Sequence, residues 1–134
     1  MTYLSALPTY LLIALGSAIG GVGRYWISGL VARWFGETFP WGTLVVNVLG
    51  SFIIGAFATL TAPDGRWLVA TEARQFVMVG LCGGYTTFSS FSLQTLNLIH
   101  EGEWLWAGVN ILLSVTLCLV VVWLGHVSAT ALNR

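Results

Sequence analysis

Four long apolar stretches, separated by short polar turns, constrain this chain more than any other feature. They cover about residues 10–32, 41–60, 75–99 and 104–127. A helix needs about 20 apolar residues to cross the hydrocarbon core of a bilayer, and each stretch reaches that length. Only 7% of the 134 residues are charged, against about 25% in an ordinary globular domain. The sequence therefore predicts an all-α integral membrane protein with four transmembrane helices, forming a single domain over residues 1–134.

Charge placement excludes several classes of function. The five basic and five acidic side chains cancel, and proteins that bind nucleic acid usually present a basic face, so no nucleic-acid partner is expected. No acidic residue lies inside an apolar stretch, whereas a proton-coupled cation exporter would need a carboxylate in the membrane. Whatever crosses the membrane is therefore expected to be neutral or anionic.

Catalytic groups are not gathered anywhere in the sequence. His100 and His126 lie at the ends of apolar stretches, and Cys82 and Cys118 are single thiols without metal-ligand spacing. The serines of segment 89–92 have no base beside them. We therefore expect no enzyme.

The arginines give only a weak orientation signal. With four spans, both termini and the second linker lie on the same side of the membrane. That side holds Arg66, Arg74 and Arg134, and the opposite side holds Arg33 with Arg24 nearby. A firmly oriented membrane protein has a heavier excess on its cytoplasmic side. Two interpretations stay open at this point: a small protein with weak orientation signals, or a chain that inserts both ways and pairs antiparallel.

Small residues recur at four-residue spacing within the spans. Gly16 with Gly20, Ser51 with Gly55, and Gly80 with Gly84 are such pairs. Within lipid, small residues at this spacing let helix backbones approach closely. They predict a tightly packed bundle.

The stretch "GGYTTFSSFS", residues 83–92, is unusually polar for the middle of a span. Glycine and threonine are poor helix formers, so we expect the third helix to break over residues 83–86. Freed carbonyls would suit a cation, while freed amides and hydroxyls such as those of Thr87 and Ser89 would suit an anion. Phe88 and Phe91 share one face, and their positive ring edges could hold a small anion. Alternatively, the rings face lipid and the hydroxyls bond to carbonyls one turn earlier.

Three motifs together resemble the CrcB/Fluc family of fluoride channels over nearly the whole chain: "GGVGRYWI", "WGTLVVNVLGSFIIG" and "GGYTTFSSFS". The resemblance implies an antiparallel dual-topology homodimer with two pores, as a multi-pass protein of the bacterial cytoplasmic (inner) membrane. The implied activity is passive export of cytosolic fluoride down its electrochemical gradient.

The resemblance also implies specific sites. A structural Na+ ion at the dimer interface would be held by the main-chain carbonyls of Gly83 and Thr86. The side chains implied along the fluoride pathway are Arg24 near the vestibule, Asn47, Phe88, Phe91 and Ser114.

Two positions depart from the family pattern. Many members have tyrosine where this chain has Asn110, and a small residue near Cys118. These departures concern the polar face of the fourth helix. The alternative function is a non-conducting membrane scaffold, in which the polar stretch serves only helix association.

Overall fold

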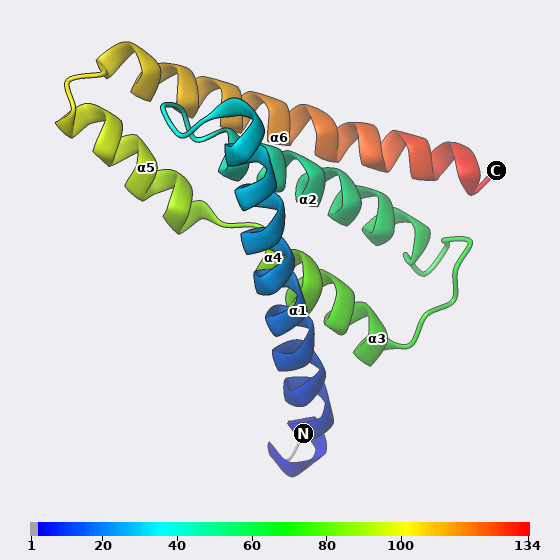
Figure 1. Cartoon of the computed structure of the whole chain (residues 1–134). Helices are drawn as coiled ribbons and strands as arrows, with labels where there is room; N and C mark the ends of the chain where they lie inside the picture. The colour runs from blue at the N-terminus through cyan, green and yellow to red at the C-terminus, as the bar shows by residue number, and fades with distance from the viewer. Residues whose placement is uncertain (1–2) are drawn as a thin grey trace.

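The chain folds into helices throughout the part that the computed structural model describes, residues 3–134, with side chains from Ala6 onward. Four helical stretches are long and apolar enough to cross a membrane: 6–35, 41–60, 71–100 and 104–132. The elements, shown in Figure 1, are α1 (Tyr3–Phe35), α2 (Trp41–Leu60), α3 (Thr71–Gln75), η1 (Phe76–Cys82), α4 (Gly83–Tyr85), α5 (Phe88–His100) and α6 (Trp104–Leu132). The four predicted spans are confirmed.

The first and last spans are longer than the apolar stretches that predicted them. α1 continues to Phe35, where Gly36 adopts φ 81° and ends the helix by donating its amide to the Ala32 carbonyl at 2.9 Å. α6 continues to Leu132, whose carbonyl accepts a hydrogen bond from Arg66 Nη1 at 2.9 Å. Apolar composition marks only the part of a helix inside hydrocarbon, so the ends depend on these capping bonds instead.

The third span is interrupted in its middle. After α3 the chain forms the π-helical segment η1 and a short α-helical piece, α4, and then becomes extended at Thr86 and Thr87. The prediction of a break over residues 83–86 was wrong for Gly83–Tyr85, which are helical, and the break lies over Thr86 and Thr87 instead.

Close packing explains why the glycine pair stays helical. A Cβ atom on Gly84 would lie 2.6 Å from the carbonyl oxygen of Ser17 on α1. Glycine here permits contact between two helix backbones and does not interrupt the helix. Threonine is β-branched and favours extended backbone, so the chain opens two residues after Gly84.

The same small residues join α1 to the first half of the third span. A Cβ on Gly16 would lie 2.9 Å from the Cα of Gly80, and one on Gly20 would lie 2.8 Å from the amide nitrogen of Tyr85. In Figure 1, α1 crosses this part of the third span while α2 and α6 run side by side. The predicted close packing at these pairs is confirmed.

The α2–α6 pair forms the centre of the molecule. Val46 is fully buried, and Leu44, Leu60, Ala107 and Ala129 are also buried. At one end, the buried Phe39 ring packs against Trp41 and Trp106, with centroid distances of 4.7 and 5.7 Å. This cluster fixes the α1–α2 turn against the start of α6 and thereby supports the groove described below.

Candidate functional site

The break in the third span is held by one side chain from α2. Asn47 Nδ2 donates to the main-chain carbonyl of Thr87 at 2.9 Å, and Asn47 Oδ1 accepts from the Thr87 amide at 2.7 Å. The two bonds satisfy the amide and the carbonyl of Thr87, whose extended backbone has no hydrogen-bond partners within a helix. An unpaired peptide group inside a membrane protein costs several kcal/mol, so Asn47 stabilises the broken conformation.

Hydroxyl groups cap the helix that follows the break. Thr87 Oγ1 accepts from the Ser90 amide at 3.1 Å and lies 3.2 Å from the hydroxyls of both Ser89 and Ser90. Threonine is a favoured residue at the helix N-cap. The start of α5 is therefore a cluster of neutral hydrogen-bonding groups.

Other hydroxyls in the third span bond one turn back. Thr86, Ser92 and Thr95 donate to the carbonyls of the residues four positions earlier, at 2.8, 2.9 and 2.7 Å. The interpretation that hydroxyls bond to carbonyls one turn earlier is thus confirmed for these three, whereas Thr87, Ser89 and Ser90 form the cap.

An inner cavity of about 370 Å³ lies beside the break. It brings together most of the residues singled out from the sequence, and its lining includes Asn47, Gly83, Thr86, Thr87, Phe88, Phe91, Ser114 and Cys118. None of the described side chains that line it carries a charge. The Phe88 and Phe91 rings are tilted by 49° with centroids 5.2 Å apart. Phe91 is 8% exposed, whereas Phe88 is 76% exposed.

The break also removes the usual hydrogen-bond donors of the main-chain carbonyls of residues 83–86. In a continuous helix the Thr87 amide would bond to the Gly83 carbonyl and the Ser90 amide to the Thr86 carbonyl. These amides bond instead to Asn47 Oδ1 and Thr87 Oγ1. The Gly83 and Thr86 carbonyls, which the resemblance implied as ligands, are therefore among the four carbonyls of residues 83–86 that lose a helical donor.

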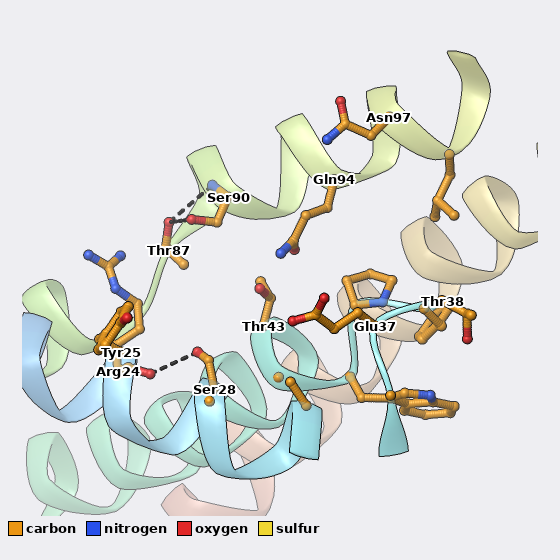
Figure 2. A pocket seen from close by; sticks show the side chains of 18 of the residues that line it. Arg24, Tyr25, Ser28, Glu37, Thr38, Thr43, Thr87, Ser90, Gln94 and Asn97 are labelled. Atoms are coloured by element: carbon orange, nitrogen blue, oxygen red, sulfur yellow. Dashed lines mark hydrogen bonds between the residues drawn. The ribbon is translucent and has the colours of Figure 1, made fainter. Parts of the chain in front are cut away.

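An outer groove of about 760 Å³ adjoins the inner cavity, because Thr87 lines both. Its walls come from the end of α1, the start of α2 and the length of α5, and include Arg24, Ser28, Thr43, Ser90, Gln94 and Asn97 (Figure 2). Arg24 thus lines the outer groove and does not line the inner cavity.

Sequence reasoning missed several polar residues of this groove. Gln94 points into it from α5 in Figure 2, and its Oε1 atom is buried without a hydrogen-bond partner among the described residues. Thr43 of α2 is also buried on the groove wall. A polar residue near the end of a span can equally well face the interface, so no local pattern marked these two. Ser89, in contrast, was singled out but is exposed and does not line either cavity.

A second polar chain joins α6 to α5. Asn110 is 1% exposed; its Nδ2 donates to Thr95 Oγ1 at 2.9 Å, and its Oδ1 accepts from Ser114 Oγ at 3.3 Å. Asn110 and Ser114 are four residues apart and therefore lie on the same face of α6. Thr95 was missed, since a lone threonine in a helix usually bonds only to its own backbone.

Comparison with known proteins gives a consistent result. The family described as CrcB-like protein, Camphor Resistance (CrcB), matches residues 11–126. The fluoride-specific ion channel FluC of Opitutus terrae is 68% identical over 124 residues, which are 92% of this chain and 94% of that protein. The protein of the same name from Rhodospirillum rubrum is 62% identical over 126 residues, 94% of this chain and 98% of that protein. The one from Paramagnetospirillum magneticum is 64% identical with the same coverage.

The family match and the three relatives each extend over most of the chain, and the motifs that carry the resemblance lie inside the matched region. This chain belongs to the CrcB family.

Proposed function

We propose that this chain is a fluoride-selective passive channel, not an enzyme, and that the inner cavity beside the break is part of its ion pathway. The observation that carries the proposal is the composition of that cavity: an asparagine, two phenylalanine rings and hydroxyl groups, with no charge among its described lining residues. The names and close similarity of the relatives support the same activity.

The cavity chemistry suits a small, strongly hydrated anion. Such an ion enters a pore only if donors there replace its water. Asn47 uses one of its two amide hydrogens on Thr87, which leaves the second for an anion. Ring edges of Phe88 and Phe91 add weak positive potential, and Ser114 adds a hydroxyl. Neutral donors of this kind bind an anion without the tight hold of a fixed cation, so the ion can also leave.

The outer groove supplies an entrance. Arg24 is a positive charge on its wall, while the acidic residues Glu37 and Glu101 line the same groove, so the attraction of an anion is confined to the part of the wall around Arg24. From there Thr87, which lines both spaces, leads to the inner cavity.

The pathway is completed, in this proposal, by a second copy of the chain in antiparallel orientation, giving two pores per dimer. Phe88 is 76% exposed although it lines the cavity, and Gly83 is also exposed. The main-chain polar groups of a broken helix would be costly if they faced lipid at this depth, and a partner helix would cover both the break and the Phe88 ring. The weak arginine asymmetry fits a chain that inserts both ways.

A structural Na+ ion fits the residues present. The Gly83 and Thr86 carbonyls have lost their helical donors, and carbonyl oxygens are suitable ligands for a hard cation. When bound, the ion would supply positive charge that offsets the partial negative charge of these carbonyl oxygens at the subunit interface. Gly83 and Thr86 would contribute main-chain atoms only, so their side chains need not be polar.

The biological role we propose is export of cytosolic fluoride across the bacterial inner membrane. Hydrogen fluoride is a weak acid that crosses lipid in its neutral form and releases the anion in a neutral cytoplasm. A passive channel then lets the anion leave down its electrochemical gradient.

Flux from loaded vesicles tests the proposal. Purified protein in liposomes should release fluoride rapidly and chloride at the rate of protein-free vesicles. Phe88→Ile and Phe91→Ile keep an apolar side chain but remove the ring edge, so fluoride flux should fall at least tenfold. Phe52→Ile, on the exposed face of α2, is the matched control and should conduct like the wild type.

The scaffold alternative makes the opposite prediction. A wild-type protein that releases no more fluoride than empty vesicles would rule out the channel. If the wild type conducts and both isoleucine variants match it, the rings only pack and the pathway lies elsewhere.

A further inference from the structure

Asn110 lies outside both cavities but is bonded to Ser114, which lines the inner one, and to Thr95, which is bonded to the main chain of the cavity residue Phe91. We propose that Asn110 is a positioning residue of the ion pathway: it holds the Ser114 hydroxyl in a resting orientation and, through Thr95, anchors the backbone at Phe91. This inference rests on the proposed fluoride conduction. It assigns a role to a position where this chain departs from the family pattern.

The hydrogen-bond directions follow from the number of hydrogens each group has. Thr95 has one hydroxyl hydrogen and donates it to the Phe91 carbonyl at 2.7 Å. Towards Asn110 it can then only accept, which places the amide Nδ2 on that side at 2.9 Å. The Oδ1 atom consequently faces Ser114, and the single Ser114 hydrogen is donated to it.

This arrangement creates a competition at Ser114. Ser114 lines the inner cavity, but in the resting state it presents lone pairs there, which repel an anion. To bind fluoride, the hydroxyl must turn its hydrogen into the cavity and leave Asn110 Oδ1 unpaired at a position that is 1% exposed. A buried acceptor without a partner is costly, so Asn110 weakens the Ser114 site for fluoride.

The Ser114 bond is the one that can open. Its length of 3.3 Å exceeds the usual range for hydroxyl donors, whereas the two bonds on the Thr95 side are 2.7 and 2.9 Å. The Thr95 side thus stays fixed while the hydroxyl turns. The fixed Thr95 bond helps to hold α5 in place, because among the described elements α5 contacts only α6 and, more sparsely, α2.

Asn110→Leu tests the competition. Leucine has a similar size but accepts no hydrogen bond, so the Ser114 hydrogen is free for the anion. The half-saturating fluoride concentration of initial vesicle flux should fall by about three- to tenfold, the range expected when a weak competing bond is removed. Thr116→Val, which removes an exposed hydroxyl elsewhere on α6, is the control and should leave the value unchanged.

The decisive measurement is the half-saturating fluoride concentration of Asn110→Leu in a protein that also carries Ser114→Ala. If Asn110 acts through Ser114, the shift should vanish there, because no hydroxyl remains to be released. A general packing defect would instead shift both backgrounds alike, and that result would overturn the inference. An unchanged half-saturation in Asn110→Leu would overturn it too.

Poor folding of Asn110→Leu and a non-conducting wild type each have a defined consequence. If Asn110→Leu is not monodisperse in size-exclusion chromatography, Thr95→Val replaces it: the amide loses its fixed acceptor and can rotate, so the same Ser114-dependent shift is expected, and its absence counts against the proposal. If wild-type vesicles release no fluoride at all, the proposed function fails and this inference with it. That result is distinct from normal conduction without an Asn110 effect.

Discussion

Asn47 uses both ends of its side-chain amide on a single residue, Thr87. The family resemblance implied that Asn47 lies on the fluoride pathway. It could not indicate this geometry, because the partner is main chain, and a main-chain group carries no residue-type signal. Part of the cost of a broken span is thus met by a side chain from another helix.

Asn47→Asp should reduce fluoride flux by at least 100-fold. The carboxylate can still accept from the Thr87 amide but cannot donate to the Thr87 carbonyl, and it places a negative charge beside the anion pathway. Loss of one buried hydrogen bond also costs about 1–3 kcal/mol of folding free energy. Vesicle flux and the apparent melting temperature in detergent measure the two effects.

Asn133→Asp is a closely matched control. Asn133 likewise donates to a carbonyl, that of Thr59, and accepts from an amide, that of Arg66. It does so at the end of α6, away from both cavities, so flux should stay near the wild-type value. Wild-type flux in a well-folded Asn47→Asp protein would place Asn47 outside the pathway.

At the scale of elements, the sequence predicted the number and place of the helices but misplaced the break. Low helix propensity pointed to Gly83 and Gly84, a penalty of about 1 kcal/mol each. Packing of Gly84 on Ser17 overrides that penalty, and this contact joins helices far apart in sequence. The π-helical turn of η1 has no sequence signature either; such turns are frequent at functional sites.

Two neighbouring substitutions separate propensity from packing. Gly84→Ala should destabilise the fold by about 1–3 kcal/mol, because its Cβ would lie 2.6 Å from the Ser17 carbonyl oxygen on a helix that cannot retreat freely. Gly83→Ala raises the helix propensity by the same amount as Gly84→Ala, but its Cβ would meet only the Met78 carbonyl at 3.8 Å. Only Gly84→Ala should lower the apparent melting temperature in detergent. Equal melting temperatures would show that α1 does not press on Gly84.

At the scale of the whole molecule, the arginines give only a small charge difference between the two ends of the helix bundle. Arg66 and Arg74 lie on the linker between the second and third spans, and Arg33 lies at the opposite end of α1. Arg66 is bonded to the end of α6 and Arg74 Nε to Thr61 Oγ1, so both also serve local structure. This small excess predicts insertion in both directions.

Labelling of the C-terminus tests that prediction. A cysteine replacing Arg134, in a protein whose Cys82 and Cys118 are alanine, should react with an impermeant maleimide on both faces of the cell membrane. About half of the sites should need membrane permeabilisation to react. Complete labelling from one face alone would contradict dual topology while leaving the channel proposal to the flux experiment.

The Asn47–Thr87 contact also has a meaning for biosynthesis. The two residues are 40 positions apart, and Asn47 is synthesised first. A ribosome therefore delivers the broken span into a bilayer where the group that satisfies its exposed peptide is already in place on the preceding helix. Asn110, which fastens the same helix further along, emerges afterwards. The order of helices along the chain thus protects the most vulnerable span during insertion, and a circular permutant that began after α2 would lose that protection.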